Sequence, residues 1–208
     1  MKKVNLIVFA MLLVAQISFG QSGGLSAFNF LNFNTSSRAA ALGGSAIVTT
    51  AEDVSLMVYN PGQLFSTIDK QFSVSYVGYA SDISYSDFVY AQKSKRFGMI
   101  GGYVHNANYG TFVQTDLAGN ISGEFKASDN AIGLTWAKQL DSTLNLGVSV
   151  KGVFSNLGLG NTSNALAADA GINYHLARKN FSAAFVIRNF GAQLKKFDGG
   201  STERLPLQ

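Results

Sequence analysis

The sequence predicts an all-β protein, an antiparallel transmembrane β-barrel with an N-terminal segment folded inside it. Three observations support this class: an export signal at the N-terminus, long segments of alternating polarity after residue 70, and connections that alternate between short and long. The composition agrees, because 22 glycines, 16 phenylalanines and only two prolines suit long strands joined by tight turns.

The first twenty residues have the pattern of a secretory signal peptide. Lys2 and Lys3 supply positive charge, an apolar run of roughly a dozen residues begins at Leu6, and the small residues Ser18 and Gly20 stand at positions −3 and −1 before a cleavage point at Gln21. This run is shorter than the ~20 residues that a membrane-spanning helix needs, and no later run approaches that length. We therefore expect residues 1–20 to be removed on export, and any membrane crossing to use strands.

The segment 144–155, LNLGVSVKGVFS, shows the strand pattern most clearly. Val148 and Val150 share one face with other apolar residues, while Ser149 and Lys151 share the opposite face. A soluble sandwich would bury the apolar face, whereas an outer-membrane barrel turns it to lipid and lines its lumen with the polar face. Strands are predicted at 71–79, 84–92, 97–106, 129–139, 144–155, 165–176 and 181–190, with another beginning at Leu205.

The predicted connections favour the membrane alternative. Short ones and long ones alternate: 93–96, 141–143 and 177–180 are short, and 107–128, 156–164 and 191–204 are long. This alternation is typical of outer-membrane barrels, whose long loops lie outside the cell. We therefore expect a set of apolar side chains to face lipid on the convex surface: Leu134, Val148, Val150, Ala170, Ile172, Phe185 and Ile187. A lysine should be costly at Val150 and tolerated at Ser149.

The number of predicted strands is too small for a closed barrel. Bacterial barrels usually have an even number of strands, and an open sheet edge is not stable in hydrocarbon. Seven strands and the short stub at Leu205 leave the wall unfinished. We therefore interpret residues 70–208 as the N-terminal, incomplete part of a barrel.

Residues 21–69 have no strand pattern, and we expect them to form a hatch inside the barrel. Ser36 is a candidate cap for a short helix through Arg38 that Gly43 and Gly44 end. Thr50 is a candidate cap for a second helix, with Glu52 and Asp53 in its first turn. Asn60-Pro61-Gly62 fits a type II turn.

These hatch helices are too short to form a core of their own, so they need a wall to pack against. Arg38, Asp53, Asn60 and Pro61 should therefore lie inside the curve of the strands. We expect Arg38 to pair with an acid or with carbonyl groups at a helix end.

The strand register predicts a row of charges on the polar face. Symmetric closure of the loop at 156–164 places Lys151 opposite Asp169, and the tight turn at 177–180 places Asp169 opposite Arg188. The turn at 141–143 places Gly133 beside Lys151. In a wet lumen each such pair is worth roughly 0.2–1 kcal/mol, so this row would join the strands and present charge to the hatch.

The chemistry-bearing residues exclude several classes of function. The chain has no cysteine, so neither a disulfide framework nor a thiolate metal site is available. No basic tract suggests nucleic-acid binding. No serine or acid accompanies His105 or His175 in a recognisable arrangement, and Asp53 and Asp69 have no partner at metal-ligand spacing. We expect no catalytic, cofactor or metal site, and therefore not an enzyme.

Several motifs together resemble the PorQ family of outer-membrane proteins. They are FLNFNTSSRAAALGG, AEDVSLMVYNPGQL, SVSYVGYASDISYSDFVYA, ASDNAIGLTWAKQL and IRNFGAQLKKFDGG with ERLPLQ, and they extend from Phe28 to Gln208. That family belongs to the PorV/PorQ group of FadL-like barrels and to the type IX secretion system. Its hatch motif corresponds here to Arg38, Gly43, Gly44, Asp53, Asn60 and Pro61. Gly62 stands where the family usually has alanine, which keeps a small residue after the turn.

The resemblance implies a barrel of roughly fourteen strands with residues 21–69 as its hatch. It implies a non-catalytic place in the cell-surface attachment complex, beside a PorV-like carrier and a PorU-like sortase. There the barrel would hold a PorZ-like surface protein while secreted cargo is anchored outside. The long outer loops would be the parts able to touch a partner.

A second hypothesis is a FadL-like outer-membrane channel for hydrophobic small molecules. Such a channel should line its path with apolar side chains. The predicted lumen-facing side chains, among them Asn145, Ser149, Asn173 and Ser182, are mostly polar. This polarity favours the docking hypothesis over the channel.

Overall fold

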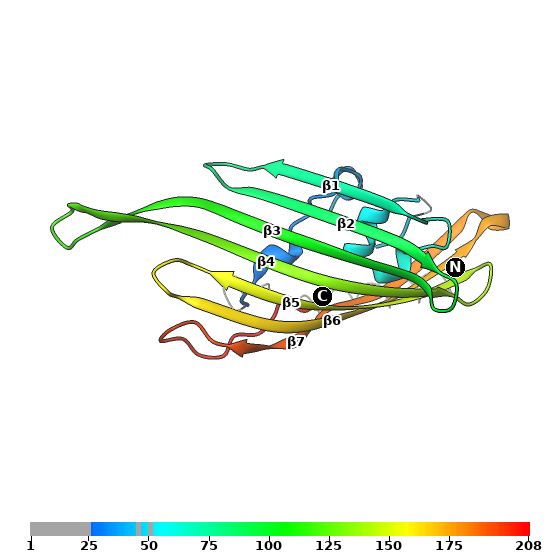
Figure 1. The fold of residues 1–208 in the computed structure, drawn as a ribbon. Coiled ribbons are helices and arrows are strands. Elements are labelled where there is room, and N and C mark those ends of the chain that lie inside the picture. Colours follow the sequence, from blue (N-terminus) through cyan, green and yellow to red (C-terminus); the bar gives the residue numbers. More distant parts are fainter. Residues whose placement is uncertain (1–25, 45–46, 50–51) are drawn as a thin grey trace, which may run out of the picture.

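The computed structural model describes residues 26–44, 47–49 and 52–208. The predicted signal peptide and the predicted cap Thr50 lie outside the described residues. The fold is all-β, as predicted: one antiparallel sheet of seven strands in chain order, which is not closed and is consistent with an incomplete β-barrel (Figure 1). The strands are β1 (Gln71–Gly78), β2 (Ser84–Ser94), β3 (Gly98–Thr115), β4 (Ile121–Gln139), β5 (Leu144–Asn156), β6 (Thr162–Leu176) and β7 (Phe181–Lys195).

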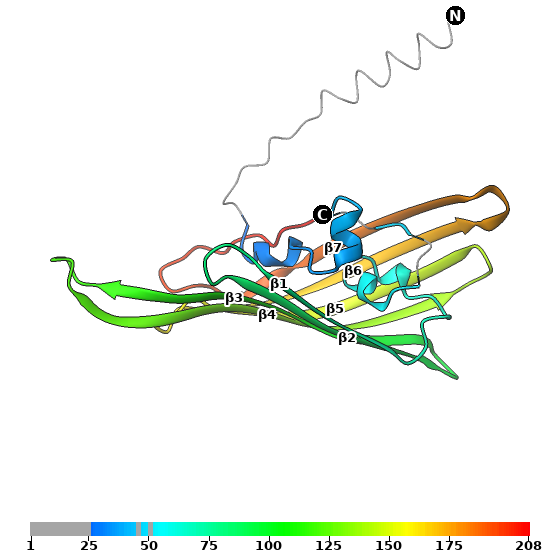
Figure 2. The same ribbon diagram turned by 90° about the horizontal axis from the view of Figure 1, so that it is seen from above.

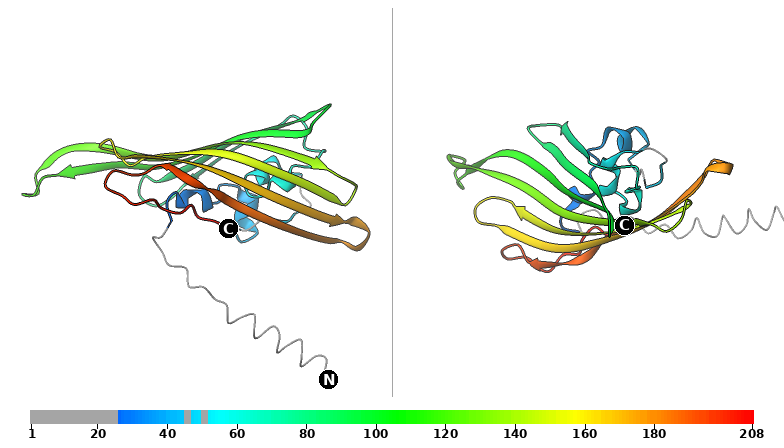
Figure 3. Two further views of the ribbon diagram at one scale, coloured as in Figure 1. Left: turned by 90° about the horizontal axis from the view of Figure 1, so that it is seen from below. Right: turned by 45° about the vertical axis from the view of Figure 1, so that its right-hand side comes forward.

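The sheet is curved, and the described part of the hatch lies inside the curve (Figures 2 and 3). The described part of the hatch contains four short helices: η1 (Asn29–Asn32), α2 (Ser37–Ala41), η2 (Val54–Val58) and η3 (Pro61–Gln63). A further turn of 3-10 helix, η4 (Ala177–Lys179), connects β6 to β7. Among the described residues, no helix is long and apolar enough to cross a membrane.

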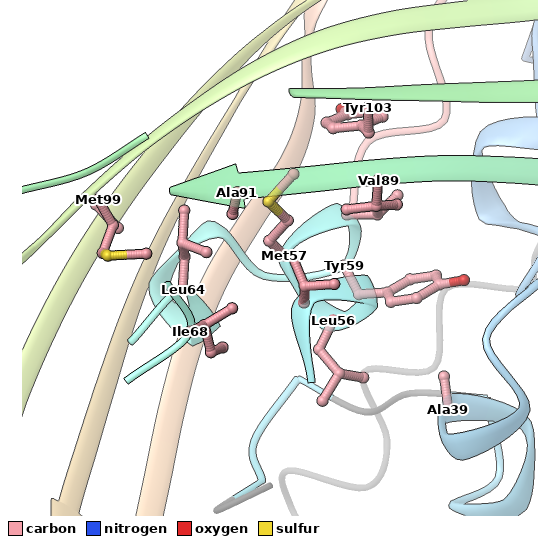
Figure 4. Packing of buried hydrophobic residues seen from close by; sticks show 13 residues of the cluster. Ala39, Leu56, Met57, Tyr59, Leu64, Ile68, Val89, Ala91, Met99 and Tyr103 are labelled. Atoms are coloured by element: carbon pink, nitrogen blue, oxygen red, sulfur yellow. The ribbon is translucent and has the colours of Figure 1, made fainter. Parts of the chain in front are cut away.

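Apolar side chains of the hatch pack on the concave wall, as Figure 4 shows. Leu56 and Met57 from η2, with Leu64 after η3, are fully buried. They meet Val89 of β2 and Met99 of β3. The hatch therefore obtains from the sheet the core that its own short helices cannot supply.

The convex side of the sheet carries the apolar residues predicted to face lipid. Each of the seven is exposed, and each alternates along its strand with residues that are buried or partly buried on the concave side. The prediction of which side chains share the convex face is therefore confirmed. The predicted contact with lipid itself belongs to the proposal below.

Val150→Lys should destabilise the inserted protein by about 2–4 kcal/mol, the range for a lysine on a barrel's lipid face near mid-membrane. Ala184→Lys is the matched control, because Ala184 is partly exposed on the opposite face of the sheet. Urea unfolding in lipid vesicles measures both effects. Equal costs at the two positions would contradict a lipid-facing convex surface.

The prediction of a loop at 107–128 is wrong, because β3 and β4 continue through these residues as a two-stranded ribbon. A bulge follows Asn108, after which Thr111 pairs with Lys126 and the rings of Phe112 and Phe125 stack at 5.3 Å. The strands predicted at 97–106 and 129–139 therefore cover only the part of β3 and β4 outside this ribbon. The ribbon keeps its hydrogen-bonded ladder because it makes its own cross-strand pairs.

Asp116 organises the tip of this ribbon. Its carboxylate accepts hydrogen bonds from the backbone N–H of Ala118 at 2.9 Å and of Asn120 at 2.8 Å. The Asn120 side chain, which also donates to it, helps to hold the pKa of Asp116 below its usual range. The tip is thus a hydrogen-bonded turn.

The other two predicted long loops are also shorter in the structure. β5 and β6 are joined by residues 157–161, and β7 continues to Lys195. No strand begins at Leu205, contrary to the prediction. Instead Arg204 forms a parallel bridge with Ser26 of the hatch, and the backbone of Gln208 exchanges hydrogen bonds with that of Arg188.

Local structure in the hatch follows the predicted signals only in part. The Ser36 side chain caps α2, and Gly43 and Gly44 end it with positive φ angles, both as predicted. The second helix is the 3-10 turn η2, capped by Asp53, whose Oδ1 accepts from Ser55 N–H at 2.9 Å. Asp53 is therefore the cap and not a first-turn residue.

The prediction of a type II turn at Asn60-Pro61-Gly62 is wrong. A type II turn would place Gly62 at positive φ, which it does not have. Asn60 Oδ1 accepts from Gly62 N–H at 2.8 Å and starts η3 as its cap. The asparagine side chain thus selects a helical turn over the type II turn.

Candidate functional site

The candidate functional site is the buried boundary between the hatch and the concave wall. It has three parts: the seat of η3 on β5 and β6, a charge cluster on β5–β7, and a polar cluster on β2 and β3. Each part joins residues far apart in the sequence. Together these three sets of contacts hold the hatch against the wall.

The seat of η3 is built from an asparagine and two facing glycines of the wall. Asn145 Nδ2 donates to Gly62 O at 2.7 Å, and Gly147 lies opposite Gly171 across β5 and β6. A Cβ at Gly147 would overlap the backbone of Pro61, and one at Gly171 would overlap Asn60 Oδ1. The two glycines therefore leave the space that η3 occupies.

Asn60 itself joins two parts of the hatch. Its side chain is fully buried, and its Nδ2 donates to Ile47 O at 2.7 Å while Oδ1 caps η3. Gln63 Nε2 donates to the same carbonyl at 3.0 Å. The Asn-Pro motif is thus a buried anchor as well as a turn signal.

The predicted pairing of Lys151 with Asp169 forms, although in a different register. Lys151 Nζ lies 2.9 and 2.8 Å from the two Asp169 carboxylate oxygens. Directly opposite Lys151 on β6 is Ala167, because the connection at 157–161 closes two residues away from the symmetric prediction. The pair is therefore diagonal. Gly133 lies opposite Lys151 on β4, as predicted.

Arg188 does not complete the predicted row. A bulge between Ala168 and Ala170 sets both Arg188 and Asn189 against Asp169, and it is Asn189 N–H that donates to Asp169, at 2.7 Å. The Asn189 φ of 60° accommodates the extra residue.

Arg188 turns instead to the hatch and to the end of the chain. Its guanidinium donates to Leu31 O at 3.0 Å and to Gln208 Oε1 at 2.7 Å, and it lies 5.6 Å from the Tyr59 ring centroid. The residue therefore holds the hatch against β7 and does not extend the ion pair.

The expectation of a wet lumen at this ion pair is wrong. Lys151 and Asp169 are 3% and 4% exposed, because the hatch covers the concave face. Because an unpaired buried charge is costly, removing one partner of this pair should cost more than the estimate made for a solvated pair. The same cover removes the expected tolerance of a lysine at Ser149, which is buried.

Sequence reasoning missed a polar cluster between the hatch and strands β2 and β3. His105 Nδ1 contacts Asp87, and His105 Nε2 lies 3.0 Å from Phe30 O, a carbonyl to which the ring must donate. Thr35 Oγ1 donates to the other Asp87 oxygen, and Tyr59 OH accepts from Thr35 N–H at 2.9 Å. Burial raises the pKa of Tyr59 above its usual range, so the phenol keeps its proton. The cluster therefore attaches two hatch segments to the wall.

Arg38 pairs with Asp53 through Nε at 3.0 Å, as predicted. The pair joins α2 to the cap of η2, but the Arg38 side chain is about half exposed. Exposed ion pairs contribute little, about 0–1 kcal/mol. This pair therefore arranges the hatch without being a main source of its stability.

The expectation that no serine or acid accompanies either histidine is wrong. His105 contacts Asp87, and His175 Nδ1 lies 2.8 Å from Ser182 Oγ. The hydrogen bonds of the described residues give His175 no carboxylate partner, so Ser182 and His175 do not form a triad. Within the same part of the chain, no group of three or more His, Asp or Glu side chains could hold a metal ion.

The boundary is thus a set of buried hydrogen bonds and one buried ion pair whose chemistry is that of attachment. Among models of known protein families and among curated proteins, nothing matches this chain.

Proposed function

We propose that this protein is a non-catalytic outer-membrane barrel component of the type IX secretion system that docks the cell-surface attachment complex. Three features support this: the export signal, the exposed apolar convex face, and the resemblance of residues 28–208 to the PorQ family. The partners are then a PorZ-like surface protein, a PorU-like sortase and a PorV-like carrier. The cargo consists of secreted proteins that are anchored at the cell surface.

The observation that carries the proposal is the ribbon formed by residues 109–127, which we call the arm. It projects beyond the rest of the sheet in Figure 1. β2 begins at Ser84, opposite Asn108, and β5 ends at Asn156, opposite Ser128. Both edges of the arm are therefore unpaired among the described strands, and they offer backbone groups to which a partner strand can add.

The side chains of the arm suit a protein partner. Val113, Leu117 and Ile121 are exposed near its tip, and Asp116 keeps the turn ordered. An ordered ribbon loses less conformational entropy on binding than a flexible loop of the same length. The filled, largely polar concave face gives no support to the alternative of a channel for hydrophobic molecules.

Replacing residues 112–125 by Asn-Gly tests this proposal, because Thr111 and Lys126 already face each other and a two-residue hairpin can join them. We expect the shortened protein to insert into the outer membrane but to lose the PorZ-like partner in pull-downs from membranes. Replacing the β5–β6 connection, residues 157–161, by Asn-Gly is the control and should retain the partner.

Retention of the whole complex by the shortened protein would overturn the role of the arm. The proposed function would be overturned if the protein were absent from the outer membrane. It would also be overturned if pull-downs of the unaltered protein contained none of the three partners. The channel would be supported instead if deletion of the protein abolished uptake of a hydrophobic substrate by the cells and left the attachment complex intact.

A further inference from the structure

The convex face has an apolar groove near the outer ends of β6 and β7. It encloses about 570 Å³, and small residues form its floor: Ala168, Gly191 and Ala192. Larger side chains flank it: Val150, Leu166, Phe190 and Leu194. Phe190 and Leu194 are 70% and 71% exposed, so these walls stand out from the sheet.

The groove follows from the local pairing of β6 with β7. The bulge between Ala168 and Ala170 shifts the outward positions of β7 from odd to even numbers, which brings Phe190, Ala192 and Leu194 to the convex face. Ala192 lies opposite Leu166, and Phe190 lies opposite Ala168. Each large residue thus faces a small one, and the two small residues lie diagonally between the large ones, which leaves a groove between them.

Lys195 ends β7 where this groove meets the outer end of the sheet, and a second exposed lysine, Lys196, follows it. Lys195 Nζ donates to Thr162 Oγ1 at 2.5 Å, at the first residue of β6. Among the described residues, none of the ion pairs involves Lys195. Ala168 is six residues along β6 from Thr162, about 20 Å at the rise of an extended strand.

We propose that this groove holds an acyl chain of an anionic lipid whose phosphate lies at Lys195. The inference rests on the membrane placement in the proposed function, but not on the secretion partners. The groove supplies an apolar surface for the chain, and the lysine supplies charge complementarity at the level of the headgroup. A lipid is favoured over a protein segment because the groove itself is apolar and positive charge lies only beyond one end of it, at the end of β7.

The test uses the protein purified from outer membranes and reconstituted in phosphatidylcholine vesicles. The probe is spin-labelled phosphatidylglycerol with the label near the end of its acyl chain, compared with spin-labelled phosphatidylcholine. We expect a motionally restricted spectral component that favours phosphatidylglycerol roughly fivefold, as one lysine near a membrane surface would produce.

Two substitutions separate the headgroup from the chain. Lys195→Gln should remove the preference for phosphatidylglycerol while keeping the restricted component. Ala192→Trp should remove the restricted component by filling the groove. Lys179→Gln, in the turn η4 that precedes β7, and Ala183→Trp, near the start of β7, are the matched controls, and both should leave the spectra unchanged. Leu194→Ala, which removes one wall without adding volume, serves if Ala192→Trp does not insert.

The inference fails if both groove variants leave the restricted component and its lipid preference unaltered. It also fails if a photo-crosslinker at position 192 captures a protein in intact membranes and no lipid. Absence of the protein from the outer membrane would instead overturn the proposed function, and membrane fractionation detects that outcome separately.

Discussion

Gly147→Ala should displace the hatch from the wall. The added Cβ would overlap the backbone of Pro61 and come within 2.6 Å of Gly62 N, and neither group is the movable end of a flexible side chain. Overpacking of a buried site costs about 1–3 kcal/mol. We expect the cost of this substitution to lie at or above the upper end of that range, because the overlap can be relieved only if η3 moves as a whole.

Faster proteolysis within residues 52–69 and a larger conductance in planar bilayers would report this displacement. Gly171→Ala should act in the same direction, since its Cβ would overlap Asn60 Oδ1. Gly102→Ala is the control, because the nearest atoms to its added Cβ would be 3.6 Å away. A Gly147→Ala protein with the proteolysis pattern of the unaltered protein would contradict the seat described here.

Lys151→Met should destabilise the protein by about 3–5 kcal/mol, the range for removing one partner of a buried ion pair. The variant leaves the Asp169 carboxylate buried, with Asn189 N–H as its remaining hydrogen-bond donor among the contacts described. Asp169→Asn should cost a similar amount by leaving the ammonium group unpaired. The double variant should lose much less than the sum of the two, because neither charge remains.

Urea unfolding of the protein in lipid vesicles gives these free energies. Arg38→Ala is the control for an ion pair near the surface, and we expect it to change stability by about 0–1 kcal/mol. Additive losses in the double variant, or single losses as small as that of Arg38→Ala, would mean that water reaches the pair.

The alternation of side chains predicted much of the wall because it is a local property. In β5 the polar and apolar residues alternate from Leu144 to Lys151, and the structure places them on opposite faces as predicted; Val153 is an apolar exception on the inward face. The approach of Lys151 to Asp169 could be predicted for the same reason. Opposite charges on one face of adjacent strands still meet when the register is shifted by two residues, and the observed register differs from the prediction by two residues.

Two glycines in the sequence indicate the seat of η3, although the predictions above did not include it. Gly147 and Gly171 both fall on the polar, inward face of their strands, where side chains would otherwise line the lumen. Facing glycines on an inward surface indicate the close approach of another backbone. Which backbone approaches them could not be predicted, because Pro61 lies in another segment and no local period links the two.

The all-β class, the inward and outward faces of the strands and the α2 cap could thus be predicted from the residues alone. These depend on side-chain period and on capping groups within a few residues of one another. Only the tertiary structure decided that Arg188 contacts Leu31, that His105 and Asp87 hold Thr35 and Phe30, and that Lys151 is buried. Each of these depends on where the hatch lies against the wall, and that position results from the packing of segments distant in the chain.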